Sequence, residues 1–194
     1  MLASLDVLPD SPQKPVSSSI EPGPCLRSYH ASDRRAVLHL YHHGLIASPP
    51  DPQDPATDLD HIEKVYLKRP QDHFWVAQAD HDVIASIAIS EDDRQVGHVR
   101  RLRVDEAWKT WHAGQVAVAL IEKAAYHARE HDCLKLVLHT PVNDEWAIAL
   151  LHQQGFSFAR IRGLGEKRSL EFYLNIYGQP KNPDGHADAP LSFR

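Results

Sequence analysis

The sequence lacks most of the features that define a specialised protein class. Its 194 residues include two cysteines, which are too few for a disulfide scaffold or a cysteine-ligated metal site. No apolar run approaches the ~18 residues of a membrane-spanning helix. The first residues show no basic stretch followed by an apolar core, so we expect no secretory signal. These absences predict a cytoplasmic protein with no metal cofactor and no membrane partner.

Positive charge is also scarce. The chain has 21 Lys and Arg against 26 Asp and Glu, a formal net charge of -5. A nucleic-acid-binding domain normally presents a basic excess, so we expect no nucleic-acid partner. Net negative charge instead favours cationic small molecules slightly, through electrostatic steering. The length predicts one globular domain that is large enough to bury a sizeable core.

Both ends of the chain lack hydrophobic periodicity. Residues 1–24 are rich in proline and serine, and residues 178–194 are polar and contain several prolines and glycines. Such segments cannot bury enough apolar surface to offset the entropy lost on ordering. We therefore expect a mobile arm over 1–24, a folded domain over 25–177 and a disordered tail over 178–194.

Within the domain, periods typical of strands and helices alternate. A first strand and helix are expected in 27–44, and a short helix in 59–66. The remaining expected strands are 73–78, 83–89, 96–104, 134–139, 156–161 and 170–176. The remaining expected helices are a long one that ends near residue 131, and 144–153. The order β-α-α-β-β-β-α-β-α-β-β predicts an α/β fold with a mixed, mostly antiparallel sheet and one β-α-β unit.

Three local motifs resemble one family. LRVDEAW (102–108) is similar to a central strand and turn of the form L-x-V-x-P-x-aromatic. LHT (138–140), followed by a helix that ends in ALLHQQGF (149–156), is similar to A-x-x-L-Y-x-x-x-G-F. The opening segment 27–45 looks like a first strand and helix. In this order they resemble the GNAT superfamily of acyl-CoA-dependent N-acetyltransferases over nearly all of 25–177. The resemblance implies a twisted sheet with helices on both faces, and acetyl-CoA as cofactor.

The resemblance also implies an acetyl-CoA loop after the central strand. The N–H groups at the start of the next helix, together with the helix dipole, suit a pyrophosphate. The stretch is KTWHAGQVAVAL (109–120), and two registers stay open: His112 and Gly114, or Gln115 and Ala117, take the glycine positions of the family motif. The predicted loop residues are Lys109, His112, Ala113, Gly114, Gln115, Val116 and Ala117.

The central strand is expected to hold the pantetheine arm. In the family this strand diverges from its neighbour, so the free backbone groups of Leu102, Arg103 and Val104 are predicted cofactor contacts. A bulge near Arg103 would supply an N–H for the oxyanion. Asp144 stands where the family often has an asparagine that contacts the cofactor.

A candidate base follows from the same alignment. Family members often place a glutamate at the start of the central strand, and His98 occupies that position here; imidazole titrates near pH 6.5. The alternative is that His98 is one of 14 histidines that happens to lie at a strand start. Glu91 and Asp92 are weaker candidates. The tyrosine that serves as general acid in the family is replaced by Leu151, so the thiolate would have to leave without it.

The other histidines and the aromatic residues allow simpler interpretations. His127 and His131 have the i,i+4 spacing of zinc ligands, but no third ligand is evident, so we expect a solvated helix face. Trp108 and Trp111 could wall a binding cleft, whereas we expect Trp75 and Trp146 in the core or at an interface. Tyr41 and the loop 49–55 would shape the acceptor pocket.

The sequence predicts an N-acetyltransferase that moves an acetyl group from acetyl-CoA to a primary amine by direct attack in a ternary complex. The acceptor would be a small-molecule amine or a peptide N-terminus. The alternative is a catalytically inactive GNAT-like domain that acts as a binding or scaffold module. The hairpin 156–176 could also pair two chains as a homodimer.

Overall fold

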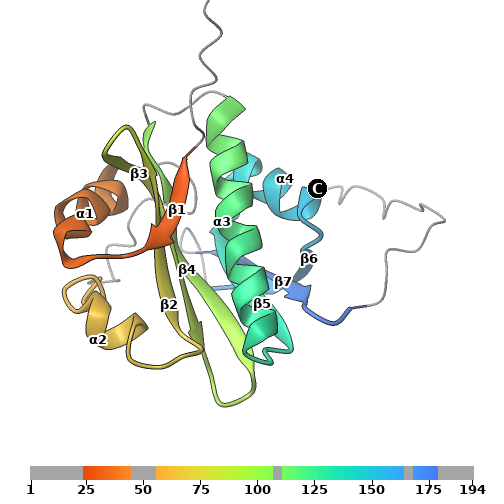
Figure 1. The fold of residues 1–194 in the computed structure, drawn as a ribbon. Coiled ribbons are helices and arrows are strands. Elements are labelled where there is room, and N and C mark those ends of the chain that lie inside the picture. Colours follow the sequence, from red (N-terminus) through yellow and green to blue (C-terminus); the bar gives the residue numbers. More distant parts are fainter. Residues whose placement is uncertain (1–23, 45–55, 107–110, 164–167, 179–194) are drawn as a thin grey trace, which may run out of the picture.

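A mixed sheet runs through the computed structural model, which describes residues 24–44, 56–106, 111–163 and 168–178 (Figure 1). Its seven described strands lie in the order β1-β2-β3-β4-β5-β7-β6. They are β1 (Cys25–Ser28), β2 (His73–Ala79), β3 (Asp82–Glu91), β4 (Val96–Val104), β5 (Lys135–Pro141), β6 (Ser157–Arg162) and β7 (Ser169–Asn175). The helices are η1 (Ala31–Asp33), α1 (Arg34–His43), α2 (Ile62–Tyr66), α3 (Trp111–Glu130) and α4 (Glu145–Gln153). Among the described strands, β4 and β5 pair in parallel and all other neighbours are antiparallel.

The element order predicted from the sequence is confirmed, and so is the mixed, mostly antiparallel sheet with helices on both faces. The predicted arm and tail fall almost entirely outside the described residues. No helix in the described part of the chain is long and apolar enough to cross a membrane.

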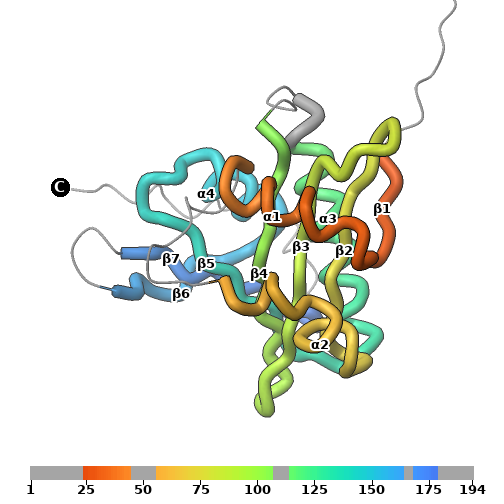
Figure 2. Tube along the Cα trace, turned by 90° about the vertical axis from the view of Figure 1, so that its left-hand side faces the viewer, coloured from red at the N-terminus to blue at the C-terminus, as the bar shows by residue number. Residues whose placement is uncertain are grey.

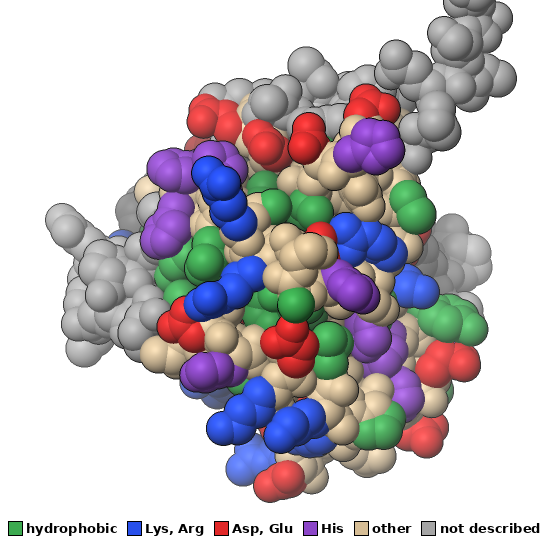
Figure 3. Space-filling model, turned by 60° about the vertical axis from the view of Figure 1, so that its left-hand side comes forward, with side chains coloured by type: hydrophobic (Ala, Val, Ile, Leu, Met, Phe, Trp, Pro, Cys, Tyr) green, Lys and Arg blue, Asp and Glu red, His purple; other side chains and the backbone are tan. Residues whose placement is uncertain are grey.

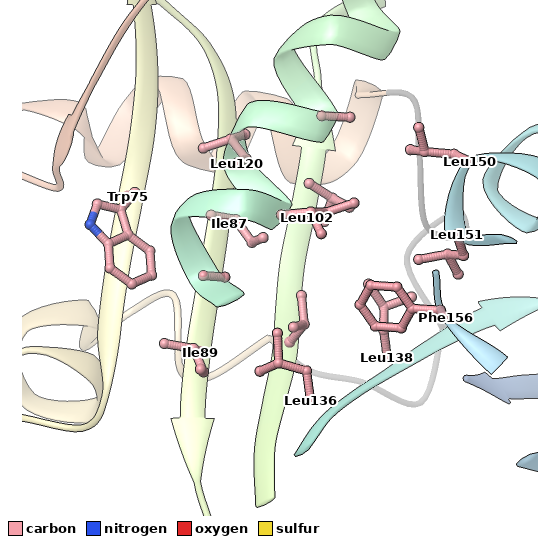
Figure 4. Packing of buried hydrophobic residues seen from close by; sticks show 14 of the residues in the cluster. Trp75, Ile87, Ile89, Leu102, Leu120, Leu136, Leu138, Leu150, Leu151 and Phe156 are labelled. Atoms are coloured by element: carbon pink, nitrogen blue, oxygen red, sulfur yellow. The ribbon is translucent and has the colours of Figure 1, made fainter. Parts of the chain in front are cut away.

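The larger core lies between the sheet and the helices α3 and α4. The apolar stripe of α3 packs onto the sheet, with Leu120, Ala124 and Ala128 fully buried. In Figure 4 the side chains of Leu120 and Leu102 lie close together, and Leu138, Leu151 and Phe156 form a second group beyond β4. Because burial of one such side chain contributes roughly 1.5–3 kcal/mol, this face holds the long helix firmly against the strands.

A second core lies on the opposite face, under α1 and α2. Residues of β2 alternate between the two cores: Phe74 and Val76 point to α1 and α2, and Trp75 and Ala77 point to α3. Because both faces of β2 are covered, the strand reads as a nearly continuous apolar run instead of an alternating one.

The two ends of the sheet are covered differently. On one face, α1 packs against β3 and β4, and α2 packs against β2 and β3. Figure 2 views the sheet from this side, and β7 and β6 extend beyond both helices. We call β1–β4 the first half-sheet, in which β2, β3 and β4 are covered by helices on both faces. We call β5, β7 and β6 the second half-sheet, and its surface on the α1 side is the open face.

One buried ion pair ties α2 and its preceding turn to the sheet. Arg101 of β4 donates from Nε and Nη2 to the carboxylate of Asp58, at 2.9 and 2.5 Å. The hydroxyl of Tyr66 donates to the same carboxylate at 2.5 Å. Burial, and then the hydrogen bond to Asp58, hold the pKa of Tyr66 well above its ordinary value. The carboxylate therefore has two buried partners from different elements.

The end of α1 lies directly against β4. A side chain at Gly44 would place its Cβ 2.5 Å from the carbonyl oxygen of Leu40 and 3.1 Å from that of Val104. Contacts this short with backbone atoms leave no room for a Cβ. The glycine therefore lets the helix end close to the last residues of the central strand.

Candidate active site

The parallel strands β4 and β5 pair over only three residues before they separate. The register joins Val96–His98 to Lys135–Val137 and ends there in the described part of the chain. Beyond this point β5 continues to pair with β7 as far as Pro141. The segment Val99–Val104 of β4 therefore has no described strand on its β5 side, which we call the β4–β5 separation.

A bulge bends β4 within the separation. Ala88 of β3 lies opposite Arg100 and Ser86 lies opposite Arg103, so β4 uses one more residue than β3 over this step. Arg101 has a φ of 53°, and the hydroxyl of Ser86 donates to its carbonyl oxygen at 2.9 Å. The bulge therefore lies at Arg101 and Leu102, just before the predicted position near Arg103.

The backbone of β4 directs N–H groups into the separation. The N–H of Asp105 donates to the carbonyl of Ile84 on the β3 side, at 2.7 Å. Because successive N–H groups of an extended strand point to opposite sides, those of Val104 and Leu102 point away from β3. Both side chains are buried in the core beneath α3. The predicted pantetheine contacts at Leu102 and Val104 are thus backbone groups at the separation, while the Arg103 side chain is buried on the α1 side, 5.7 Å from the ring of Tyr41.

Most of the predicted loop residues belong to the first turns of α3. The helix begins at Trp111, so the N–H groups of residues 111–113 have no acceptor within the helix. Lys109 and the side chains of His112 and Ala113 lie outside the described part of the structure. Gln115 is exposed, while Val116 and Ala117 are buried in the core at 4% and 0% exposure. Of the predicted loop, the backbone of the first turn is therefore the part that is placed to meet an anion.

The first turn of α4 adjoins the first turn of α3. A Cβ on Gly114 would lie 3.9 Å from Cζ2 of Trp146, which is 45% exposed. Trp146 was expected in the core or at an interface, and the structure excludes only the core, whereas Trp75 is a core residue with 4% exposure. Asp144 caps α4, because its Oδ1 accepts the N–H of Ala147 at 3.0 Å.

A buried hydroxyl faces the same region. Thr140, near the end of β5, is fully buried, and its Oγ1 has no hydrogen-bond partner among the described residues. Strand alternation puts Thr140 on the same side of the sheet as Leu138, which packs under α3 and α4. A buried hydroxyl without a partner is costly, so this position favours a ligand with a polar group.

The predicted base, His98, lies at the opposite end of the separation from Val104. Its side chain is 32% exposed, and its Nε2 is 3.1 Å from Oδ2 of Asp92. The other oxygen of Asp92 accepts the backbone N–H groups of Arg94 and Val96 in the β3–β4 turn. The hydrogen bond from His98 is the main reason that the pKa of Asp92 lies below its ordinary value. The structure therefore ties His98 to a turn, four residues before Leu102.

Helix α4 has no acid at the position that a tyrosine occupies in the family. Leu151 is 1% exposed and belongs to the core. The neighbouring His152 points to a different side, where its ring centroid lies 5.3 Å from that of Phe172.

Histidine side chains gather in groups on the surface seen in Figure 3. Ring contacts identify one such group, in which His127 lies 4.3 Å from His131, 5.5 Å from His73 and 5.0 Å from Trp75 between ring centroids. The expectation of a solvated helix face is wrong for His127. Burial, together with the charges of His131 and His73, lowers its pKa to about 4. Its Nε2 donates to the carbonyl oxygen of Gln71 at 3.2 Å, so the ring acts as a packing residue.

Sequence reasoning missed a cluster on the open face. Glu171 of β7 is 7% exposed and lies opposite His139 of β5. Arg160 and Arg162 of β6 donate from Nε to its carboxylate at 3.0 and 2.5 Å, and Nε2 of His139 lies 3.7 Å from Oε2. Three strands supply these residues. The signal available in the sequence was the alternation of Arg160 and Arg162 in a predicted strand, but this alternation does not reveal that Glu171 is their partner.

A hollow of about 570 Å³ opens at the end of β4, on the α1 side. Apolar residues of α1 and β3 and side chains of both charges line this hollow. The hollow is lined by Ser32, Arg35, Ala36, His39, Ala79, Asp80, Asp82, Val83, Ile84 and Asp105. It therefore gives access to the end of the central strand from the side that α3 does not cover.

Comparisons with known proteins agree with this geometry. A model of the GNAT acetyltransferase family matches residues 35–156, and the chain belongs to this family. No match is found among curated proteins. The resemblance seen in the sequence is therefore confirmed.

Several solved structures share the fold. A GNAT-family acetyltransferase from Staphylococcus aureus is 16% identical, with a TM-score of 0.66 over 79% of this chain and 99% of that one. A Salmonella typhimurium structure, described as an acetyltransferase with its cofactor acetyl-CoA, is 15% identical, with a TM-score of 0.66 over 84% and 100%. The ribosomal-protein-S18-alanine N-acetyltransferase of Escherichia coli is 17% identical, with a TM-score of 0.63 over 82% and 97%. At these identities the structures establish a common fold.

Proposed function

We propose that this GNAT-family protein transfers an acetyl group from acetyl-CoA to a primary amine by direct attack in a ternary complex. The observation that carries the proposal is the β4–β5 separation beside the first turn of α3. Backbone N–H groups of Leu102 and Val104 point into this separation. They are placed to pair with the amides of an extended arm and to stabilise an oxyanion.

The residues at the separation fit the cofactor. The N–H groups of residues 111–113 would hold the pyrophosphate, with Lys109 and the His112 side chain as the predicted cationic contacts. Gly114 leaves space next to the exposed Trp146, and the buried hydroxyl of Thr140 lacks a described partner. The cofactor supplies a thioester, whose thiol has a pKa of about 8.5 and can leave as a thiolate without the missing tyrosine.

The acceptor would enter from the α1 side. Helices α3 and α4 cover the other face of the sheet, whereas the open face adjoins the separation and the hollow on the α1 side reaches Asp105 at the end of β4. The neighbour that acts on a ribosomal-protein alanine supports a peptide N-terminus as one acceptor class. A panel of acceptors should contain a peptide with an N-terminal alanine, a polyamine and an acidic amino acid. The acidic amino acid is included because Arg100 is exposed beside the separation.

Calorimetry with acetyl-CoA tests the cofactor assignment. We expect micromolar binding of acetyl-CoA and of desulfo-CoA, and much weaker binding of ATP, which lacks the pantetheine arm. No heat of binding at millimolar acetyl-CoA would contradict the proposal. It would support the alternative that the domain is a binding or scaffold module.

A pair of variants at Gly114 tests the anion site. Gly114→Glu adds a negative charge to the first turns of α3, where helix termini favour anions, so CoA affinity should fall about tenfold or more. Gly114→Gln has nearly the same shape without the charge and should retain affinity. Both should melt near the wild-type temperature, because the site has room for a side chain. Equal CoA affinity in both variants would refute the assignment of the loop.

A further inference from the structure

His139 lies at the edge of the β4–β5 separation. The last paired residue of β4, His98, lies opposite Val137 of β5, so His139 is two residues further along β5, where β4 has already departed. Leu136 and Leu138 point to α3, and alternation therefore puts His139 on the open face. Its side chain is 41% exposed. An imidazole thus borders the separation on the side from which an acceptor would arrive.

A fixed carboxylate stands behind this imidazole. Glu171 lies on the adjacent strand β7, and two guanidinium groups, of Arg160 and Arg162, hold its oxygens. Burial would raise the pKa of Glu171, but the hydrogen bonds from Arg162 and Arg160 outweigh it and keep that pKa below its ordinary value. The carboxylate is therefore ionised near neutral pH. Its 3.7 Å distance from Nε2 of His139 is close enough to orient the ring and to tighten on binding.

The charged groups that face His139 come from three strands. Glu171 faces it from β7, Arg160 and Arg162 from β6, and His98 and Arg100 from β4. Burial lowers the pKa of His139, Glu171 opposes this effect, and Arg162, His98 and Arg100 add to it. The net effect is a lowered pKa, which favours the neutral ring that can accept a proton.

His98, the base expected from the sequence, is placed less well. Its Nε2 is engaged by Asp92 of the β3–β4 turn, and it lies where the two strands are still paired. We propose that His139 is the general base of the acetyl transfer and that Glu171 is its positioning residue. This inference rests on the proposed function and names the group that accepts the proton.

The imidazole of His139 takes one proton from the acceptor ammonium, directly or through one water, and the neutral amine attacks the thioester carbon. The C–N bond forms, the C–S bond breaks and the thiolate leaves with the electron pair. The second proton of the nitrogen passes to the thiolate, and His139 releases its proton to solvent. The products are the amide, CoA thiol and one proton.

The pH dependence of turnover by two variants tests His139. With the fastest acceptor of the panel, kcat/KM of the wild type should fall at acid pH as the base is protonated. His139→Ala should lower kcat/KM about 100-fold at pH 7.5 and remove this acid limb, while the affinity for acetyl-CoA stays unchanged. The control His152→Ala, an exposed histidine of α4, should keep both rate and limb.

Two results would overturn the inference in distinguishable ways. If His139→Ala keeps the limb while His98→Ala loses it, His98 is the base and the proposed function stands. If the wild type binds no acetyl-CoA and acetylates none of the panel, the proposed function itself is wrong. Retention of the limb in both variants also excludes His139.

An NMR titration of the imidazole tests Glu171. Removal of the facing negative charge in Glu171→Gln should lower the pKa of the His139 ring by about half a unit or more, because a nearby carboxylate favours the protonated imidazole. The acid limb should move to lower pH in parallel, and Glu171→Asp should restore most of the shift. A purely structural role would leave the titration unchanged, and that outcome would exclude Glu171 as the positioning residue.

Discussion

The first and second half-sheets are built from similar strands but are enclosed differently. Helices cover β2, β3 and β4 on both faces, whereas β5, β7 and β6 are covered on the α3 side and carry charged residues on the open face. Because apolar burial on both faces supplies most of the folding free energy, the first half-sheet serves as the stable platform. The second can accommodate polar groups at little cost, and the proposed acid–base chemistry lies there.

The ion pairs of the two half-sheets show the same contrast. In the first, the side chains of Asp58 and Arg101 are 14% and 12% exposed. In the second, the partners of Glu171 are 60% and 50% exposed, although the carboxylate itself is buried. Removal of Asp58 takes the carboxylate from a guanidinium that water hardly reaches, whereas removal of Glu171 leaves guanidinium groups that water can reach. The first pair is therefore structural, and the second is free to serve another role.

The largest contrast is expected from phenylalanine truncation. Phe74→Ala, in the doubly covered β2, should cost about 3–5 kcal/mol of unfolding free energy, because a fully buried ring leaves a cavity between Tyr29 and Tyr66. Phe158→Ala, at a ring that is 38% exposed on β6, should cost less than about 1 kcal/mol. Urea denaturation measures both. Similar costs would show that the two half-sheets are equally packed.

The ion pairs provide an intermediate contrast. Asp58→Ala should destabilise the protein by about 3 kcal/mol, because a buried pair loses one partner and the Tyr66 hydroxyl loses its acceptor. Glu171→Ala should cost about 1 kcal/mol, since its arginines are half-exposed. The exposed Asp60, paired with Arg34, offers a control whose alanine variant should be nearly neutral. A Glu171 variant as unstable as the Asp58 variant would contradict this division of roles.

The smallest effect concerns acid stability. The pKa of His127, which packs on Trp75 of the first half-sheet, is lowered to about 4. The unfolded chain then binds a proton more readily, so stability should fall as the pH drops from 6.5 through 4, by on the order of 1 kcal/mol after allowance for solvent screening.

Thermal melting between pH 7 and 4 measures this loss. His127→Gln keeps a donor for the carbonyl of Gln71 but does not titrate, so its melting temperature should depend less on pH. Some dependence should persist, because burial also lowers the pKa of His73. An unchanged slope in the variant would exclude His127 as the source.

The sequence predicted local structure well because each element carries its own period. The alternation in the second half of 96–104 and the apolar stripe of α3 identify the central strand and the long helix without knowledge of their partners. The family motifs then order these elements. What the sequence could not predict depends on long-range register, and the pairing of His139 with Glu171 spans the whole of α4 and β6.

The surroundings of two side chains could not be predicted, for the same reason. Trp146 is hydrophobic enough for a core, but it lies at the first turn of α4, beside Gly114 and away from the sheet. His127 has the polarity of a surface residue, yet β2 places Trp75 against its ring. In both cases a neighbour on another element determines how exposed the side chain is. The hydrophobic pattern within one helix does not contain that information.

The three residue pairs that join β4 to β5 also make the molecule mechanically heterogeneous. The two half-sheets are joined only along this short paired stretch, and α3 covers one face of the sheet where the pairing ends. A ligand whose amides pair with the free backbone groups of Val99–Val104 would link the two half-sheets. Its binding free energy would then add to the free energy of unfolding, and the two half-sheets would unfold more cooperatively. Amide hydrogen exchange of Val99–Val104 should therefore slow more than elsewhere when a ligand occupies the β4–β5 separation.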